Sequence, residues 1–70
     1  MWIRSQDKKI LTEIHDVEID SANQIWGSGM LIGEYSTEEK ALKVLDYIQE
    51  WYECSYGETF QMPQDDEVEV

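Results

Sequence analysis

A single amphipathic helix over residues 36–53 limits what this chain can fold into. Five apolar residues recur there at helical spacing and form one apolar face: Ala41, Val44, Leu45, Ile48 and Tyr52. Ser36 and Glu39 have the spacing of a capping box, in which the serine hydroxyl accepts from the Glu39 amide and the glutamate reaches back. Ser55-Tyr56-Gly57 predicts the end of the helix, near Glu53. One helix therefore has to cover whatever sheet the rest of the chain forms.

Strand patterns occupy the first part of the chain. Residues 1–6 contain tryptophan and isoleucine, which favour strands, and predict a first strand. Residues 10–19 predict a second strand, but its apolar positions change parity between Ile14 and Val17. Because a strand cannot switch faces without an extra residue, we expect a bulge or break near His15-Asp16.

Two glycines interrupt the next strand pattern. Residues 24–34 predict a third strand, in which Gly27 and Gly29 favour a bulge. A phosphate-binding glycine loop is the alternative. That alternative is disfavoured because the G-x-G-x-x-G spacing and a nearby lysine are both missing.

The C-terminal segment combines a short strand with a run of acids. Residues 58–62 predict a last strand with Phe60 and Met62 on one face, and Pro63 ends it. Residues 64–70 carry four acids and no base, which predicts a solvated, disordered tail.

Together these elements predict an α+β fold. We expect one domain over residues 1–63, a three- to four-stranded antiparallel meander with one C-terminal helix packed on one face, followed by the acidic disordered tail over residues 64–70. A domain this short buries only roughly 60% of the surface that its unfolded chain exposes. Its core is therefore thin, and an oligomer interface often supplements such a core.

The charge of the chain restricts its partners. Sixteen acidic residues face five lysines and arginines, which gives a formal net charge of -11. Direct binding to nucleic acid is disfavoured, because it depends mostly on basic residues that neutralise phosphates. The same charge disfavours an anionic membrane surface. A basic protein partner is the better match.

The location of the protein is predicted from what the sequence lacks. No apolar run is long enough to span a membrane, and residues 1–9 lack the apolar stretch of a signal peptide. Cys54 is the single cysteine and cannot form an internal disulfide, which fits a reducing compartment. These features predict a cytoplasmic protein.

Three segments give the chain a resemblance to known sequences. The segments MWIRSQDKK (1–9), GEYSTEEKA (33–41) and VLDYI (44–48) resemble a group of short uncharacterised proteins of Gram-positive bacteria and their prophages or mobile elements. The match covers about half of the chain. That group has no established activity, so no functional residues carry over. The resemblance implies a cytoplasmic setting in a bacterium or phage.

No residue pattern predicts catalysis, a metal site or a cofactor. His15 is the only histidine, and helix phase places Cys54 about 140° from the centre of the apolar face, which predicts an exposed thiol rather than a Cys–His pair. Asp16 and Glu18 share a strand face, but solvated acids explain them equally well. The tail acids lack the spacing and glycine of a calcium loop. We therefore expect a protein that is not an enzyme and holds no cofactor.

Aromatic residues are the stronger candidates for a functional surface. Tyr47 and Trp51 form a second stripe beside the apolar face of the helix, although packing at the rim of the core would explain them too. Trp2 and Trp26 have even parity in their strands, and Met30 and Ile32 share the parity and therefore the face of Trp26. The other face carries Ile3, Ile25 and Leu31. Both faces of the sheet are thus apolar, while only one helix is present to cover them. This predicts a homodimer or a docking site.

These observations lead to two functional hypotheses. The first is a non-enzymatic, acidic interaction or regulatory accessory protein of a bacterium or prophage, in which charge steers a basic protein partner and aromatic residues anchor it. The second is a homo-oligomeric structural or assembly protein. The candidate interaction surface comprises Trp2, Trp26, Tyr47, Trp51, Asp65, Asp66 and Glu67.

Overall fold

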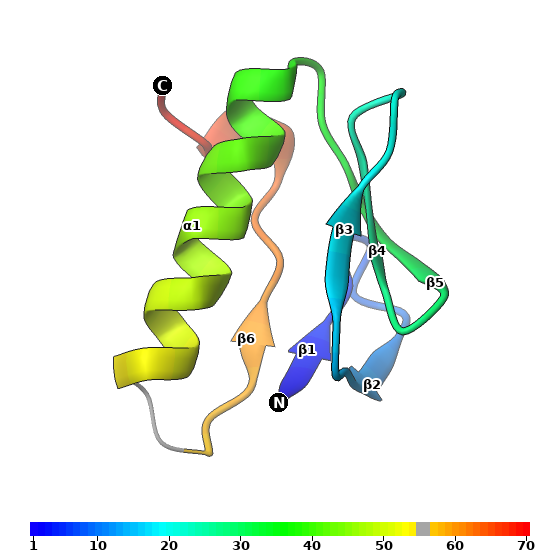
Figure 1. Ribbon diagram of the computed structural model, residues 1–70, viewed down its shortest axis with the longest axis vertical. Helices are drawn as coiled ribbons and strands as arrows, with labels where there is room; N and C mark the ends of the chain where they lie inside the picture. Colours follow the sequence, from blue (N-terminus) through cyan, green and yellow to red (C-terminus); the bar gives the residue numbers. More distant parts are fainter. Residues whose placement is uncertain (55–56) are drawn as a thin grey trace.

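Two small sheets and one long helix make up the part of the chain that the computed structural model describes, residues 1–54 and 57–70 (Figure 1). The helix stands on one side of both sheets, and the core lies between the helix and the strands. The α+β class is therefore confirmed. The single antiparallel meander is not, because the strands divide between two sheets.

The first sheet is mixed and has the order β2-β1-β6. Its strands are β1 (Trp2–Arg4), β2 (Leu11–Glu13) and β6 (Phe60–Gln61). β1 pairs antiparallel with β2 and parallel with β6. Parallel neighbours need a long crossover, and the chain between β1 and β6 provides one that includes the helix. The predicted last strand thus exists, but it closes the sheet beside the first strand.

The second sheet is an antiparallel meander of β3 (Val17–Ile19), β4 (Gln24–Gly27) and β5 (Met30–Glu34). The expectation of one bulged strand over residues 24–34 is wrong, because this segment is the β4–β5 hairpin. Ser28 and Gly29 form its turn, and both have positive φ (49° and 82°), as a two-residue type I′ turn requires. The glycine supplies the left-handed residue of a turn rather than a bulge.

A register shift in the hairpin changes which side chains face the core. Ile25 pairs with Gly33, whereas Trp26 pairs with Leu31, so Ile32 is an extra residue in β5. Ile25 and Ile32 are both buried as a result. The expectation that Ile32 shares a face with Trp26 is therefore wrong.

The predicted break near His15-Asp16 is confirmed, and it separates two sheets. β2 ends at Glu13 and β3 begins at Val17, and the intervening corner is hydrogen-bonded to the hairpin turn. The His15 amide donates to Ser28 Oγ (3.0 Å), and the Ser28 amide donates to the carbonyl and carboxylate of Asp16. This corner directs the chain from one sheet to the other.

The helix α1 (Glu38–Cys54) begins one residue later than the capping box predicts. The hydroxyl of Thr37, not that of Ser36, accepts from the helix, from the Lys40 amide (3.1 Å). The Ser36 amide instead donates to Asp65 (2.8 Å). The helix ends at Cys54, next to the predicted Glu53, and the first two residues of the predicted stop Ser55-Tyr56-Gly57 lie outside the described residues.

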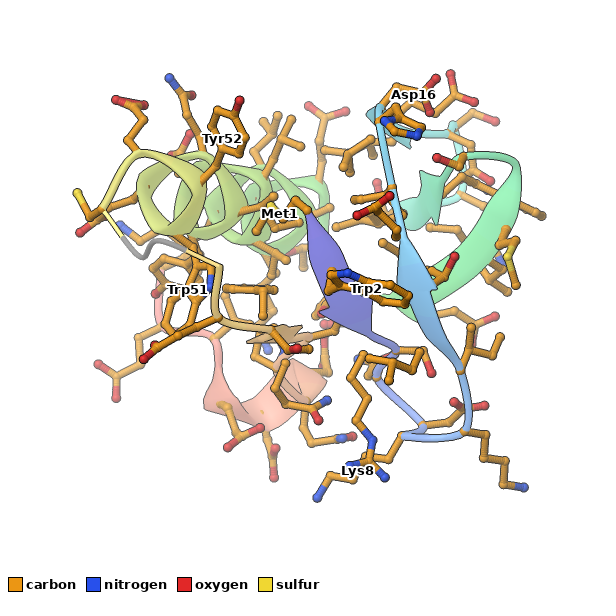
Figure 2. The ribbon with its side chains drawn as sticks, turned by 90° about the horizontal axis from the view of Figure 1, so that it is seen from below. Met1, Trp2, Lys8, Asp16, Trp51 and Tyr52 are labelled. Atoms are coloured by element: carbon orange, nitrogen blue, oxygen red, sulfur yellow. The ribbon has the colours of Figure 1, made fainter. Side chains whose placement is uncertain are left out.

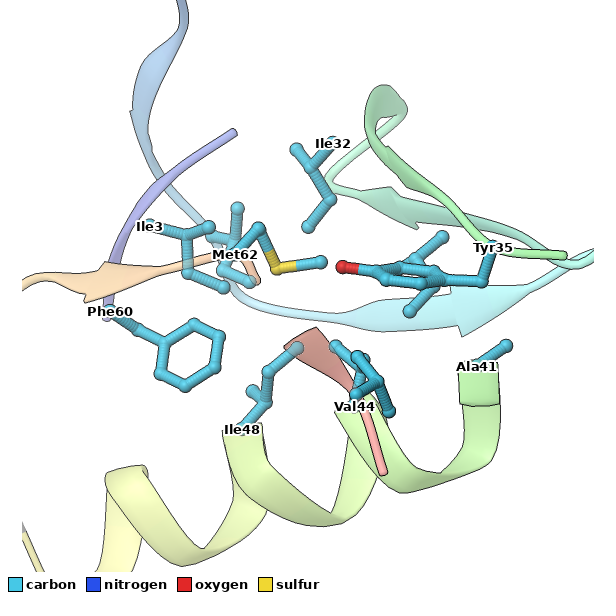
Figure 3. Packing of buried hydrophobic residues seen from close by; sticks show 11 residues of the cluster. Ile3, Ile32, Tyr35, Ala41, Val44, Ile48, Phe60 and Met62 are labelled. Carbon is cyan, nitrogen blue, oxygen red and sulfur yellow. The ribbon is translucent and has the colours of Figure 1, made fainter. Parts of the chain in front are cut away.

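The buried face of α1 is narrower than its apolar stripe. Ala41, Val44 and Ile48 are buried, as predicted, and Leu45 is half-buried. The assignment of Tyr52 to the core is wrong, because 71% of this side chain is exposed. Figure 3 shows the helix side chains packed against isoleucines of both sheets and against Phe60 and Met62, whose shared face is confirmed.

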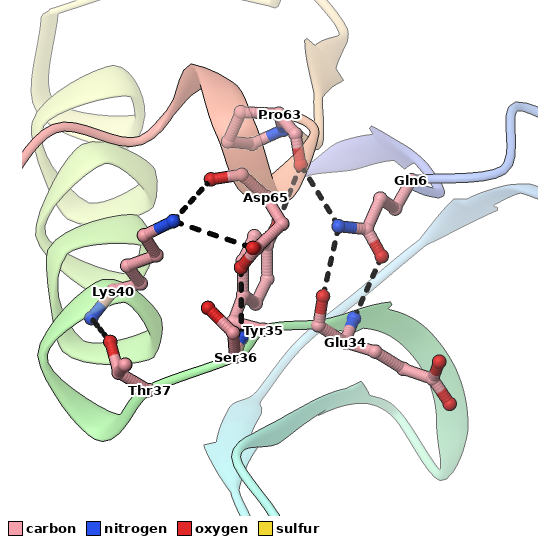
Figure 4. Close-up of polar contacts among 8 residues, drawn as sticks. All are labelled: Gln6, Glu34, Tyr35, Ser36, Thr37, Lys40, Pro63 and Asp65. Carbon is pink, nitrogen blue, oxygen red and sulfur yellow. Dashed lines mark hydrogen bonds and ion pairs between the residues drawn. The ribbon is translucent and has the colours of Figure 1, made fainter.

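Residues 64–70 are not a disordered tail. Asp65–Glu67 form the 3₁₀ turn η1, and the next residue, Val68, is buried in the core. Lys40 Nζ lies 3.3 Å from Asp65 Oδ2 and 3.0 Å from its carbonyl oxygen (Figure 4). The buried Val68 and the Lys40–Asp65 ion pair therefore hold this segment against the rest of the fold, although its acidic composition predicts a solvated tail.

Side chains from three regions meet where this segment turns back. Tyr35 donates its hydroxyl to the Pro63 carbonyl (2.8 Å), and burial, together with the nearby Asp65 and Glu67 carboxylates, raises the pKa of the Tyr35 phenol. Gln6 donates to the carbonyls of Glu34 and Pro63 and accepts from the Glu34 amide. Both residues tie the C-terminal segment to the sheets (Figure 4).

Candidate interaction surface

A groove runs between the second half of α1 and the corner that joins β2 to β3. It has a volume of about 440 Å³, and we call it the α1–β3 groove. Ile14 and Ile48 are the buried residues of its lining, and Met1, Val17 and Leu45 are the half-buried ones. Tyr52 is exposed and forms part of the helix side of the groove. The groove is therefore an apolar cleft open to solvent.

The N-terminus closes one end of this groove. The Met1 amino group donates to the Ile14 carbonyl oxygen (3.4 Å), which holds the first residue against the corner. Met1 and Tyr52 also line a second hollow, with Trp2 and Trp51, which we call the tryptophan hollow (about 620 Å³). Because the two share these residues, they adjoin across one end of the molecule (Figure 2).

Acidic side chains surround this end. Asp16 lines the groove, and Glu13, Glu53 and Glu58 line the tryptophan hollow. Within residues 1–54 and 57–70, no lysine or arginine lines the α1–β3 groove or the tryptophan hollow. Three of the five basic side chains lie instead at the β1–β2 connection: Arg4, Lys8 and Lys9. The groove thus has largely apolar walls with Asp16, His15 and the positively charged Met1 amino group, and the adjoining tryptophan hollow adds three acids.

Three of the residues singled out in the sequence lie at or beside this end. Trp2 is 46% exposed on the outer face of the first sheet. Trp51 is half-buried, packs edge-on against Phe60 with ring centroids 5.6 Å apart, and donates its indole N–H to the Glu58 carbonyl. Tyr47 lines a separate small hollow with Trp51, and the Lys43 ammonium lies 5.8 Å from its ring. Trp51 thus packs at the rim of the core and also lines the tryptophan hollow at the surface.

The other predicted surface residues lie elsewhere. Trp26 is on the outer face of the second sheet, where its indole N–H donates to Asp20 Oδ2 (2.9 Å). That hydrogen bond, followed by one from the Gln24 amide, lowers the pKa of the Asp20 carboxyl. The fold does not bring Trp26 to the groove.

The C-terminal acids are engaged within the fold. Asp65 accepts from the Ser36 amide and pairs with Lys40, and both contacts lower the pKa of its carboxyl. Glu67 accepts from the Gln64 amide (2.7 Å). Asp66 is exposed in the same turn. Asp65 thus ties this turn to the helix start, Glu67 bonds within the turn, and none of the three acids lines the groove.

Sequence reasoning missed the residues that form the groove. Met1 and Tyr52 were absent from the candidate surface, and Tyr52 was assigned to the core. The usable signal is the parity change at His15-Asp16, because such a change requires a corner, and connecting segments run over the surface, where binding residues are concentrated. The sequence contains no sign of how far Tyr52 stands from the sheets.

The chemistry-bearing side chains do not gather. His15 lines the groove, whereas Cys54 lines the hollow beside Tyr47 and is exposed, as helix phase predicts. Within residues 1–54 and 57–70, histidine, cysteine and acidic side chains form no group of three or more that could hold a metal ion. In the same described part, no helix is both long and apolar enough to cross a membrane.

Comparisons with protein-family models, with curated proteins and with solved structures found no match for this chain.

Proposed function

We propose that this chain is a non-enzymatic interaction protein of a bacterium or its prophage, and that in the cytoplasm it binds a basic segment of another protein in the α1–β3 groove. The observation that carries this proposal is the pairing of an apolar cleft with the acidic tryptophan hollow beside it. The bacterial setting rests on the sequence resemblance, and the cytoplasm on the single cysteine.

The groove supplies both parts of a protein-binding surface. Val17, Leu45 and Tyr52 offer partly exposed apolar and aromatic area, which anchors partners in interfaces. Asp16 and the acids of the adjoining tryptophan hollow add a negative potential that speeds the approach of a positive partner and repels a negative one. The net charge of -11 acts in the same direction over longer distances.

A peptide library tests this proposal without knowledge of the natural partner. Random peptides displayed on a neutral carrier are selected on the full chain at moderate salt. We expect the enriched peptides to be positively charged, to contain an apolar anchor and to bind less tightly as salt rises. Enrichment of neutral or acidic peptides would contradict the proposal.

Two helix variants locate the bound peptide. Tyr52→Ser removes an exposed groove residue, and Leu42→Ser removes a comparably placed apolar residue (47% exposed) that does not line the groove. We expect Tyr52→Ser to weaken binding about tenfold or more, the scale of an interface anchor, while Leu42→Ser changes it little. Equal effects of the two variants would place the binding site elsewhere.

The outer face of the first sheet supports a second candidate, a homo-oligomeric assembly protein. Trp2 and Leu11 are diagonal neighbours there and are 46% and 59% exposed. Sedimentation over a wide concentration range tests it. A mass that grows with concentration for the natural chain, but not for Leu11→Ser, would favour this candidate, whereas a constant monomer mass would exclude it.

A further inference from the structure

The free edge of β3 borders the α1–β3 groove. β3 ends its sheet, whose order is β3-β4-β5, and in Figure 1 it stands between α1 and β4. Val17, the first residue of β3, also lines the groove. An unpaired strand edge at the border of a groove is a place where an extended peptide can add to a sheet.

The hydrogen bonds of β3 show which backbone groups remain available. On either side of the strand, the Asp16 carbonyl accepts from the Ser28 amide of the hairpin turn, and the Asp20 amide donates to the Gln24 carbonyl of β4. In an antiparallel pair such bonds alternate, so the backbone groups of Val17 and Ile19 point away from β4. No hydrogen bond joins these groups to any other part of residues 1–54 and 57–70. The edge therefore offers two amides and two carbonyls.

From this edge we infer that the basic partner binds as an extended strand added to β3, with alternating apolar and basic side chains. The inference rests on the proposed function and specifies how the same groove is filled. Side chains on one face of the added strand lie beside Val17 and enter the groove. Those on the other face lie beside Glu18, on the outer face of the sheet, where a cation is favoured.

Charge selects a different protein over a second copy of this chain. Two β3 edges paired with each other would bring together Asp16, Glu18 and Asp20 of both copies, and like charges at cross-strand positions destabilise pairing. An acidic edge of only three residues also resists self-association in general. A lysine- or arginine-containing strand meets neither obstacle.

The probe is a short peptide that alternates lysine and valine, and its control is a peptide of the same composition with the lysines in one block. The alternating peptide is also prepared with its valine amides N-methylated, and separately with its lysine amides N-methylated. In a strand, one of these two sets faces the neighbouring edge and the other faces away. Strand addition predicts that only one methylated form loses binding, by about tenfold or more.

Hydrogen exchange on the full chain provides the second readout. The amides of Val17 and Ile19 have no hydrogen-bond partner among residues 1–54 and 57–70, so we expect their exchange to slow about tenfold or more when the alternating peptide is bound. The Glu18 amide already lies in the β3–β4 ladder and serves as the internal control. Slowed exchange at Val17 and Ile19 would support the added strand.

The outcomes separate this inference from the proposed function. If basic library peptides bind in the groove but the block peptide binds as well as the alternating one, or both methylated forms bind equally, strand addition is wrong and the proposed function stands. If Val17 and Ile19 exchange unchanged in the bound state, strand addition is also wrong. If the library yields no basic peptide, the proposed function itself fails.

Discussion

The start of α1 depends on the hydroxyl of Thr37. This hydroxyl accepts from the Lys40 amide at 3.1 Å and satisfies one of the first helix N–H groups. We predict that Thr37→Ala lowers the free energy of unfolding by about 1 kcal/mol, within the usual range of about 0.5–2 for a lost N-cap. Urea titration followed by circular dichroism measures it.

Ser36→Ala is the matched control for the cap. It keeps the backbone N–H that donates to Asp65 and removes only the weaker contact of the Ser36 hydroxyl with the same carboxylate, so we expect a smaller loss than for Thr37→Ala. A larger loss for Ser36→Ala would show that the helix is capped by Ser36, as the sequence motif suggests.

The indole of Trp26 controls the titration of Asp20. Its N–H donates to the Asp20 carboxylate and is the largest cause of the lowered pKa of that carboxyl. We predict that Trp26→Phe raises the Asp20 pKa toward the ordinary value of 3.8, as measured by NMR titration of the carboxyl carbon. Trp2→Phe, on the other sheet, should leave it unchanged.

The sign of the linked stability follows from this shift. A lowered folded-state pKa means that the hydrogen bond stabilises the native state above pH 3.8, and that this contribution is lost as pH falls through the folded value. Trp26→Phe should therefore lose stability at neutral pH and less of it in acid. A constant difference across this range would assign the effect of Trp26 to packing alone.

At the scale of elements, Val68 fastens the C-terminal segment to the core. Its side chain is 4% exposed, whereas that of Val70 is 70% exposed. We predict that Val68→Ala lowers the free energy of unfolding by about 1.5–3 kcal/mol, because it removes buried apolar surface. Val70→Ala should stay within about 0.5 kcal/mol of the natural chain.

This valine pair also tests whether residues 64–70 belong to the domain. A disordered tail predicts no effect from either substitution in chemical denaturation. If both substitutions change the free energy of unfolding equally and only slightly, residues 64–70 are a disordered tail, as their composition suggests.

Local patterns were sufficient for the elements that depend on neighbours in sequence. The helix follows from its apolar stripe, and the break near His15-Asp16 follows from strand parity, because both patterns have a period that a short segment reveals. The β4–β5 hairpin was missed because Ser28, not an asparagine or aspartate, precedes Gly29 in its turn. Neighbouring residues alone therefore gave a weak turn signal.

Pairing between distant segments could not be predicted. The parallel contact of β6 with β1 joins Phe60 to Ile3, and no local pattern encodes a partner so far along the chain. The burial of Val68 could not be predicted for a related reason. Its neighbours in sequence are acidic and suggest a solvated segment, whereas the residues that it packs against belong to the core. The groove could not be predicted either, because its walls come from three segments that are far apart in the sequence: α1, the N-terminus and the β2–β3 corner.

At the scale of the whole molecule, acidic charge is spread over the surface with little to balance it. Lys40–Asp65 is the one salt bridge among the described residues, and the net charge of the chain is -11. Repulsion between like charges therefore outweighs attraction and destabilises the compact state. Salt screens this repulsion, since charges further apart than about 10 Å are largely screened at 0.1 M.

We therefore predict that added sodium chloride stabilises the folded chain at neutral pH while it weakens the binding of a basic partner. If screening returns about 1 kcal/mol, the thermal midpoint should rise by about 4–8 °C for a domain of this size. Thermal unfolding at low and high salt measures the first effect, and peptide titration in the same buffers measures the second. At the isoelectric pH the salt dependence of the midpoint should nearly vanish. A midpoint that falls with salt at neutral pH would mean that attractive pairs dominate, and that the acidic surface is balanced within the fold rather than available to a partner.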